Sequence, residues 1–212
     1  MREKFAAQLK ELHDSLTQMA GLCEESINLA MKAFIDGVLE DAEKAMELEK
    51  EIDMKERDIE TLCYSLLLKQ QPVASDLRIV SSALKMITDL ERIGDQAEDI
   101  ADLVAHTSIR ITSPHIKQMA VEASKMVSDA VASFVNNDLE GARKVISHDD
   151  VIDNLFNVAK SEIVEQIKTA NENAEEVADL LIIIKYLERI GDHATNVAEW
   201  VVFSVTGEYK AL

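Results

Sequence analysis

The chain has 212 residues, of which 47% are hydrophobic, 29% are charged and 4% are aromatic. Its 40 acidic and 22 basic residues give a formal net charge of −18. Such a surface repels nucleic acid and anionic lipid, and it favours cations or basic protein patches as partners. The longest apolar run, LLIII at 180–184, is far shorter than the ~20 residues that cross a bilayer. These numbers predict a soluble protein that does not bind nucleic acid.

The two cysteines, Cys23 and Cys63, lie among apolar helical positions and have no Cys-x-x-Cys spacing. The first residues, MREKFAAQLKEL, are amphipathic, whereas a signal peptide carries an apolar segment. We therefore expect a cytoplasmic protein with two reduced thiols in its core.

Only 6 Gly and 2 Pro interrupt a chain rich in Ala, Leu, Ile, Glu and Lys, which predicts an almost entirely helical protein. Turn signals divide it into six helices. The first three are expected over Glu3 to Phe34, from Leu39 to just before Pro72, and from an N-cap at Ser75 or Asp76 to His106. The fourth is expected from Ser113-Pro114 to Asn136-Asn137-Asp138, which also caps the fifth, and Asn171-Glu172-Asn173 precedes a sixth over Glu175 to Phe203.

The chain contains an internal duplication. LERIGD begins at Leu90 and again at Leu187, 97 residues later, and FIDGVLEDAEKAMELEKEID from Phe34 matches FVNNDLEGARKVISHDDVID from Phe134. We attribute the shorter spacing of the later motif to a shorter linker in the second copy, where QQPVAS has no counterpart. The duplication predicts an all-α fold of two tandem pseudo-symmetric three-helix bundles with six long antiparallel helices, over residues 1–109 and 110–212.

The third and sixth expected helices each carry a heptad-like apolar stripe whose middle is Gly, Ala and Ala. Glycine inside a helix costs about 1 kcal/mol relative to alanine, so its presence in both copies predicts close approach by another helix or a ligand. The two stripes are Ala83, Ile87, Leu90, Gly94, Ala97, Ala101 and Val104, and Leu180, Ile184, Leu187, Gly191, Ala194, Ala198 and Val201.

Each copy also has two acid-xxx-Asp pairs, one on its second helix and one on its third. With this many acids, on the order of seven such pairs arise by chance, so a single pair carries no information. Four pairs at matching positions in both copies, two of them flanking the stripe glycines, favour a shared function. The pairs are Glu49 and Asp53, Glu91 and Asp95, Asp149 and Asp153, and Glu188 and Asp192.

Like charges one turn apart repel, so these pairs need a positive partner. Arg92 and Arg189 each point about 100° away from the neighbouring Glu on an ideal helix, which favours a bound cation over an arginine. Carboxylates without Cys or an obvious His suit Mg²⁺, Ca²⁺, Mn²⁺ or iron, and four of them can hold more than one ion. Asp99, Asn196 and Glu98 are candidate outer ligands. His193 is more typical of a surface or capping histidine.

No catalytic motif accompanies the acids. The sequence lacks the Glu-x-x-His of di-iron bundles, a Gly-rich phosphate loop and a Ser-His-Asp arrangement. We therefore expect a non-enzymatic adaptor. Two alternatives stay open, a metal-dependent phosphohydrolase on the same carboxylates and a metal-free helical scaffold.

LERIGDQA, LERIGDHATNVAE, QQPVASDLR and the acid-xxx-Asp pairs together resemble the PhoU family over essentially the whole chain. The resemblance implies two pseudo-symmetric three-helix bundles that bind multinuclear clusters of divalent or trivalent metal ions (Fe, Mn, Mg, Zn or Ca). The implied ligands are Glu49, Asp53, Glu91 and Asp95 in one bundle, and Asp149, Asp153, Glu188 and Asp192 in the other, with Asp99 and Asn196 further out. The second site departs from the pattern at Asp149 and Asn196, which makes it the weaker one.

The resemblance also implies a function and partners. Members restrain phosphate uptake by connecting the ATPase of a phosphate ABC transporter to a sensor histidine kinase. They are cytoplasmic, often homodimeric, and reach the membrane through their partners. The residues alone suggest Met86, Met119, Met126 and Trp200 as adaptable contacts for a dimer.

Overall fold

The computed structural model describes residues 2–107, 113–169 and 174–208, and every secondary-structure element in these ranges is an α-helix. The all-α prediction is therefore confirmed. None of the described helices is both long enough and apolar enough to cross a membrane. The helices are α1 (Arg2–Asp36), α2 (Leu39–Gln70), α3 (Ser75–His106), α4 (Pro114–Asn136), α5 (Leu139–Thr169) and α6 (Ala174–Thr206).

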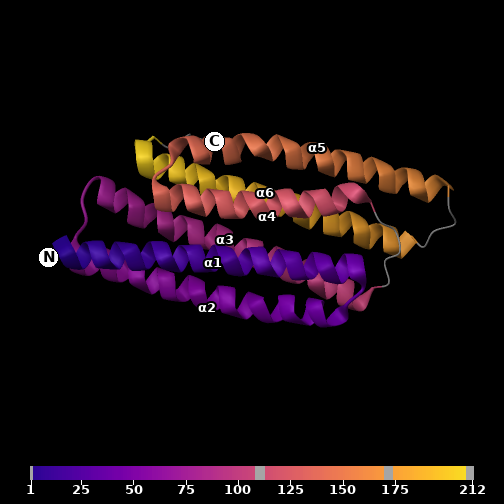
Figure 1. The fold of residues 1–212 in the computed structure, drawn as a ribbon, viewed down its shortest axis with the longest axis horizontal. Coiled ribbons are helices and arrows are strands. Elements are labelled where there is room, and N and C mark those ends of the chain that lie inside the picture. The colour runs from indigo at the N-terminus through magenta and orange to yellow at the C-terminus, as the bar shows by residue number, and fades with distance from the viewer. Residues whose placement is uncertain (1, 108–112, 170–173, 209–212) are drawn as a thin grey trace.

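The six helices pack as two three-helix bundles that lie side by side (Figure 1). Helices α1, α2 and α3 contact one another, and so do α4, α5 and α6. The bundles meet through α3 against α6 and α1 against α4, so α2 and α5 form the two outer edges. This arrangement is the predicted pair of three-helix units. The expected boundary between residues 109 and 110 lies outside the described residues.

Most helix ends follow the predicted turn signals. Ser113 caps α4, because its hydroxyl accepts a hydrogen bond from the His115 amide and Pro114 occupies the first helical position. Asn137 ends α4 in the left-handed region at φ 52°. Asp138 then accepts a bond from the Gly141 amide at 2.9 Å and so caps α5. The expected separator at 171–173 lies outside the described residues, and α6 extends to Thr206, beyond the expected Phe203.

One expectation about the turn between α2 and α3 is wrong. Ala74, not Ser75 or Asp76, precedes the helix, and no side chain caps it. Gln71 and Ala74 in this turn both have positive φ. The expected shortening of the matching linker in the second copy falls on residues 170–173, which lie outside the described residues.

The apolar stripes of α3 and α6 lie in the core, as predicted, and every one of their residues is buried. Cys23 and Cys63 are buried free thiols, and burial raises the pKa of both to about 12. The methionines suggested as dimer contacts are core residues, with exposures of 0% for Met86, 0% for Met119 and 1% for Met126. That suggestion is wrong for the three methionines because a buried side chain offers no surface to a partner.

The stripe glycines permit a close approach between neighbouring helices. A Cβ at Gly94 on α3 would lie 2.9 Å from Ile52 Cδ1 on α2, closer than carbon atoms pack. At Gly191 on α6, it would lie 3.2 Å from Ile152 Cγ2 on α5. Ile52 and Ile152 are the matching residues of the two copies, exposed by 1% and 0%. Each glycine is thus a socket for an isoleucine from the preceding helix.

We expect Gly94→Ala to destabilise the protein by about 1–3 kcal/mol, because the added methyl overpacks the socket around Ile52. Urea unfolding followed by circular dichroism measures the loss. Gly21→Ala is the control, since its Cβ would meet nothing within 4 Å, and it should gain about 0.5–1 kcal/mol. Ile52→Val removes the clashing Cδ1, so it should recover part of the Gly94→Ala loss. Equal effects of the two alanine substitutions would contradict the socket.

Candidate functional site

The contact between Ile52 and Gly94 sets the register of the acids on α2 and α3. Glu49 and Asp53 flank Ile52, one turn before it and directly after it, and Glu91 and Asp95 flank Gly94 in the same manner. All four carboxylates are partly buried. We call this set the first acidic face: Glu49, Asp53, Glu91 and Asp95.

The charges of the first acidic face act on one another across the two helices. Burial raises the pKa of Glu49, and the carboxylates of Asp53 on its own helix and Asp95 on α3 raise it further. Burial also raises the pKa of Glu91, again with help from Asp95. Asp53, on the other helix, adds to that shift. The four predicted residues therefore share one region of negative potential.

Two further acids join this face. Glu56 follows Glu49 by two helical turns, and burial and the Asp53 carboxylate raise its pKa. Burial and the carboxylate of Glu49 raise the pKa of Glu98 on α3. Glu98 was expected as an outer residue, whereas Glu56 was missed. The sequence could have predicted Glu56, because a spacing of seven residues places it on the same side of the helix as Glu49.

The second half repeats the arrangement on α5 and α6, around Ile152 and Gly191. Burial, the charge of Asp192 on α6 and then that of Asp153 raise the pKa of Asp149 to about 6. Burial followed by the Glu188 carboxylate raises the pKa of Asp192. We call this set the second acidic face: Asp149, Asp153, Glu188 and Asp192.

The two faces differ in net charge. The positions of Glu56 and Glu98 are occupied in the second half by Phe156 and Thr195, neither of which is charged. Lys185 contacts the Glu188 carboxylate, and its ammonium lies 5.6 Å from the centre of the Phe156 ring. The second face thus has fewer acids than the first, and a lysine contacts one of them.

Arginines already bind two aspartates of the first face. Arg57 bonds Asp53 at 3.0 Å on α2, and Arg92 bonds Asp95 at 3.0 Å on α3. The expectation that Arg92 points away from its neighbouring Glu and so does not neutralise these acids is therefore wrong. That expectation considered Glu91, from which Arg92 Nε lies 3.5 Å, and overlooked Asp95, which lies three residues ahead on the same side of the helix.

Residues one turn beyond the faces connect the two halves. Asn196 and His193 on α6 both bond Asp89 on α3, at 3.1 and 2.9 Å. At the matching positions, Tyr186 on α6 hydrogen-bonds Asp99 on α3. Asp99 and Asn196 thus have partners at the α3–α6 junction, and their role as outer metal ligands stays a prediction. His193 acts as a bridging surface residue in the described structure.

The residues of the acidic faces suit a hard cation in kind, because carboxylate oxygens are the donors that such cations prefer. Burial raises the pKa of Glu49 and of Asp149, and neighbouring carboxylates, whose repulsion a cation would relieve, raise both further. Within the described ranges no three His, Cys, Asp or Glu side chains are already placed to hold one ion. Asp53 and Asp95 would first have to leave Arg57 and Arg92.

The fold and the acidic faces define a class, the all-α proteins of two tandem three-helix repeats with paired carboxylates beside a glycine socket. The family model of the PhoU domain matches residues 16–104 and 116–201. The chain belongs to the PhoU family.

Known proteins resemble this chain over nearly its whole length. The phosphate-specific transport system accessory protein PhoU homolog of Pseudomonas aeruginosa is 33% identical over 97% of this chain and 86% of its own. The corresponding Synechocystis homolog is 34% identical over 98% and 93%. The crystal structure of PhoU from Pseudomonas aeruginosa superposes with a TM-score of 0.90 at 32% identity, over 96% of this chain and 100% of that one. For the phosphate transport system regulatory protein PhoU from Streptococcus pneumoniae, the TM-score is 0.90 at 29% identity, over 98% and 100%.

The raised pKa of Asp149 predicts a pH-dependent stability of the metal-free protein. Because the folded protein holds this proton up to about pH 6 and the unfolded chain releases it near 3.8, stability falls as pH rises between these values. In chelator at pH 7.5, Asp149→Asn should therefore stabilise the fold by about 1 kcal/mol, a modest figure because solvent screens a half-exposed carboxylate.

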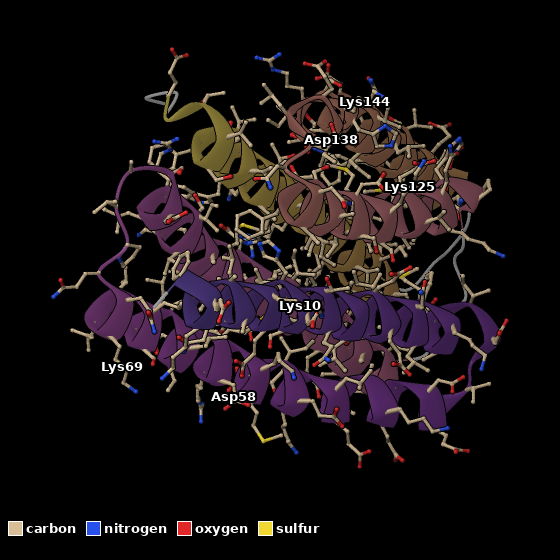
Figure 2. All side chains as sticks on the ribbon, turned by 60° about the vertical axis from the view of Figure 1, so that its left-hand side comes forward. Lys10, Asp58, Lys69, Lys125, Asp138 and Lys144 are labelled. Atoms are coloured by element: carbon tan, nitrogen blue, oxygen red, sulfur yellow. The ribbon has the colours of Figure 1, made fainter. Side chains whose placement is uncertain are left out.

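Thermal unfolding at a series of pH values measures this effect. The gain should vanish near pH 3, below the unfolded-chain pKa of 3.8, where Asp149 is largely protonated in both states. Asp58→Asn, which neutralises an exposed acid of α2 outside the face (Figure 2), is the matched control and should show no such pH dependence. A gain from Asp149→Asn that persists at about pH 3 would contradict the raised pKa of Asp149 at this face.

Proposed function

We propose that this protein is a regulatory accessory protein of a phosphate-specific transport system and restrains phosphate uptake. Membership of the PhoU family supports this proposal, as do relatives that are named accessory proteins of a phosphate-specific transport system and match most of this chain. The names of these relatives, which call them accessory proteins, support a non-enzymatic role.

Each acidic face would bind metal ions as part of this function. Glu49, Asp53, Glu91 and Asp95 would hold them on the first face, and Asp149, Asp153, Glu188 and Asp192 on the second. The ions, of the Fe, Mn, Mg, Zn or Ca type, would supply positive charge to a surface of strongly negative net charge. Such a spot can dock an acidic protein segment or phosphate. The observation that supports this most directly is that, beside burial, a carboxylate of the neighbouring helix raises the pKa of Glu49 on the first face and of Asp149 on the second.

The partners proposed for the protein follow from its family. They are the ATPase of a phosphate ABC transporter and a sensor histidine kinase, which the adaptor would connect in the cytoplasm, with membrane association only through these partners. A homodimer is proposed as well.

The difference between the faces leads to a metal-binding prediction. Asp95→Asn should lower metal affinity at least about tenfold, because even the loss of an outer-shell partner has that effect. Asp192→Asn should remove less metal, since Lys185 already offsets part of the second face. Elemental mass spectrometry after reconstitution with Mn²⁺ or Fe²⁺ measures both, and Asp58→Asn is the control. Wild-type protein without metal after reconstitution would contradict the metal-binding role.

A phosphohydrolase on the same carboxylates is the competing function. A screen of phosphate esters with Mn²⁺ distinguishes the two. The adaptor proposal predicts no turnover, and turnover that Asp95→Asn abolishes would overturn it.

Deleting the gene in its host tests the regulatory role directly. In phosphate-replete medium we expect the deletion strain to take up more phosphate, and the wild-type gene to restore the lower rate. A gene carrying Asp95→Asn and Asp192→Asn should restore it only in part. Unchanged uptake in the deletion strain would contradict a role in restraining transport.

A further inference from the structure

The second half has an open cavity between α4 and α5, away from both acidic faces. Its volume is about 440 Å³, within the range of small-molecule sites. Figure 2 shows three of its residues, with Lys125 over α4, Lys144 over α5 and Asp138 at the end of the bundle where the helices connect.

The duplication shows how the two halves differ here. In the first half, Lys32 on α1 and Asp41 on α2 form an ion pair at 2.7 Å that joins the two helices. The matching residues in the second half are Ala132 and Gly141, and both line the cavity. The second half therefore has no side chains at these positions that could form such an ion pair.

Gly141 keeps this cavity open. A Cβ at this position would lie 2.5 Å from Ser133 Oγ and 2.7 Å from Asp138 Oδ2. No side chain fits at residue 141 while Ser133 and Asp138 keep their places. Those places are fixed by the α4–α5 turn, because Asp138 accepts the hydrogen bond of the Gly141 amide that caps α5.

The second half has also gained positive charge here. Lys125 stands where the first half has Glu25, while Lys144 has a counterpart in Lys44. Lys44 pairs with Glu40 at 2.8 Å and approaches Asp41. In contrast, the ammonium groups of Lys125 and Lys144 form no ion pair with any described residue. Two free cations on opposite walls of one cavity are notable in a chain of net charge −18.

The other charged groups of the cavity are mostly engaged. His148 bonds Glu122 at 2.8 Å, and the charge of Asp138 is directed at the N-terminus of α5. Asp129 is the remaining acid. Together with the amide oxygen of Asn136, whose nitrogen donates to the Ala132 carbonyl, it offers acceptors for hydroxyl groups. Met126 and Val145 supply an apolar floor.

We propose that this cavity binds a hydroxylated phosphate monoester of the sugar-phosphate type. A phosphate monoester carries a charge of about −1.5 to −2 at neutral pH, which matches the two free lysines. Lysine binds phosphate as a point charge without a fixed orientation, and this suits two ammonium groups that reach in from opposite helices. The hydroxyl groups of the ligand would donate to Asp129 and Asn136.

Isothermal titration calorimetry with ribose 5-phosphate tests the proposal on the full-length protein in chelator, so that metal at the acidic faces plays no part. We expect saturable binding at one site. Ribose and inorganic phosphate should each bind at least about tenfold more weakly, because each lacks one set of contacts. Inorganic phosphate that binds as tightly as ribose 5-phosphate would overturn the ligand class.

Two variants locate the binding. Lys125→Met with Lys144→Met should weaken it at least about tenfold by removing both cations. Ala132→Leu should weaken it by filling the cavity without a change of charge. Lys10→Met with Lys69→Met, two lysines on the first half (Figure 2), is the matched control and should bind as wild type does. Thermal unfolding confirms that each variant is folded.

Two outcomes would overturn the proposal. One is the absence of saturable binding to the wild-type protein at millimolar ribose 5-phosphate. The other is binding that neither the cavity lysine pair nor Ala132→Leu changes.

Discussion

The structure depends on one contact that occurs in both halves. In each half, an isoleucine on the second helix packs against a glycine on the third helix. Because Gly94 and Gly191 lack a Cβ, α2 and α5 approach α3 and α6 closely enough to bury Ile52 and Ile152. The same approach places the acids of neighbouring helices beside each other. Burial raises the pKa of Glu49 and of Asp149, and the carboxylates on the neighbouring helices raise both further. Packing and chemistry are thus parts of one arrangement, which is why LERIGD contains both the glycine and its flanking acids.

The duplicated architecture leaves room for the halves to diverge. In the first half, extra acids crowd the acidic face, and an ion pair joins α1 to α2. In the second half, Lys185 and Phe156 moderate the acidic face, and an open cavity lies between α4 and α5. The α3–α6 junction keeps the halves in register through hydrogen bonds at matching positions, Asp89 with Asn196 and Tyr186 with Asp99. One half therefore concentrates negative charge, and the other provides a cavity with two lysines on its walls.

Sequence patterns predicted the fold well, because helix length, apolar periodicity and capping are local properties. The Ser113-Pro114 cap and the buried stripes are examples. The turn before α3 was predicted less well, since positive φ at Ala74 depends on how the chain crosses the bundle end. The candidate site was predicted as a set of residues but not as a geometry. The acid with which Arg92 pairs depends on side-chain rotamers, which sequence spacing alone does not determine. The exposure of a methionine is likewise decided by packing between helices.

The central claim is that the carboxylates of neighbouring helices share a cation. Anomalous X-ray diffraction from crystals grown with Mn²⁺, recorded on both sides of the manganese absorption edge, tests it most directly. The account predicts anomalous density between α2 and α3, within coordination distance of Glu49, Asp53, Glu91 and Asp95. It also predicts that Arg57 and Arg92 release their aspartates in that state. Crystals that contain manganese elsewhere but none between these helices, with both arginine pairs intact, would contradict the claim.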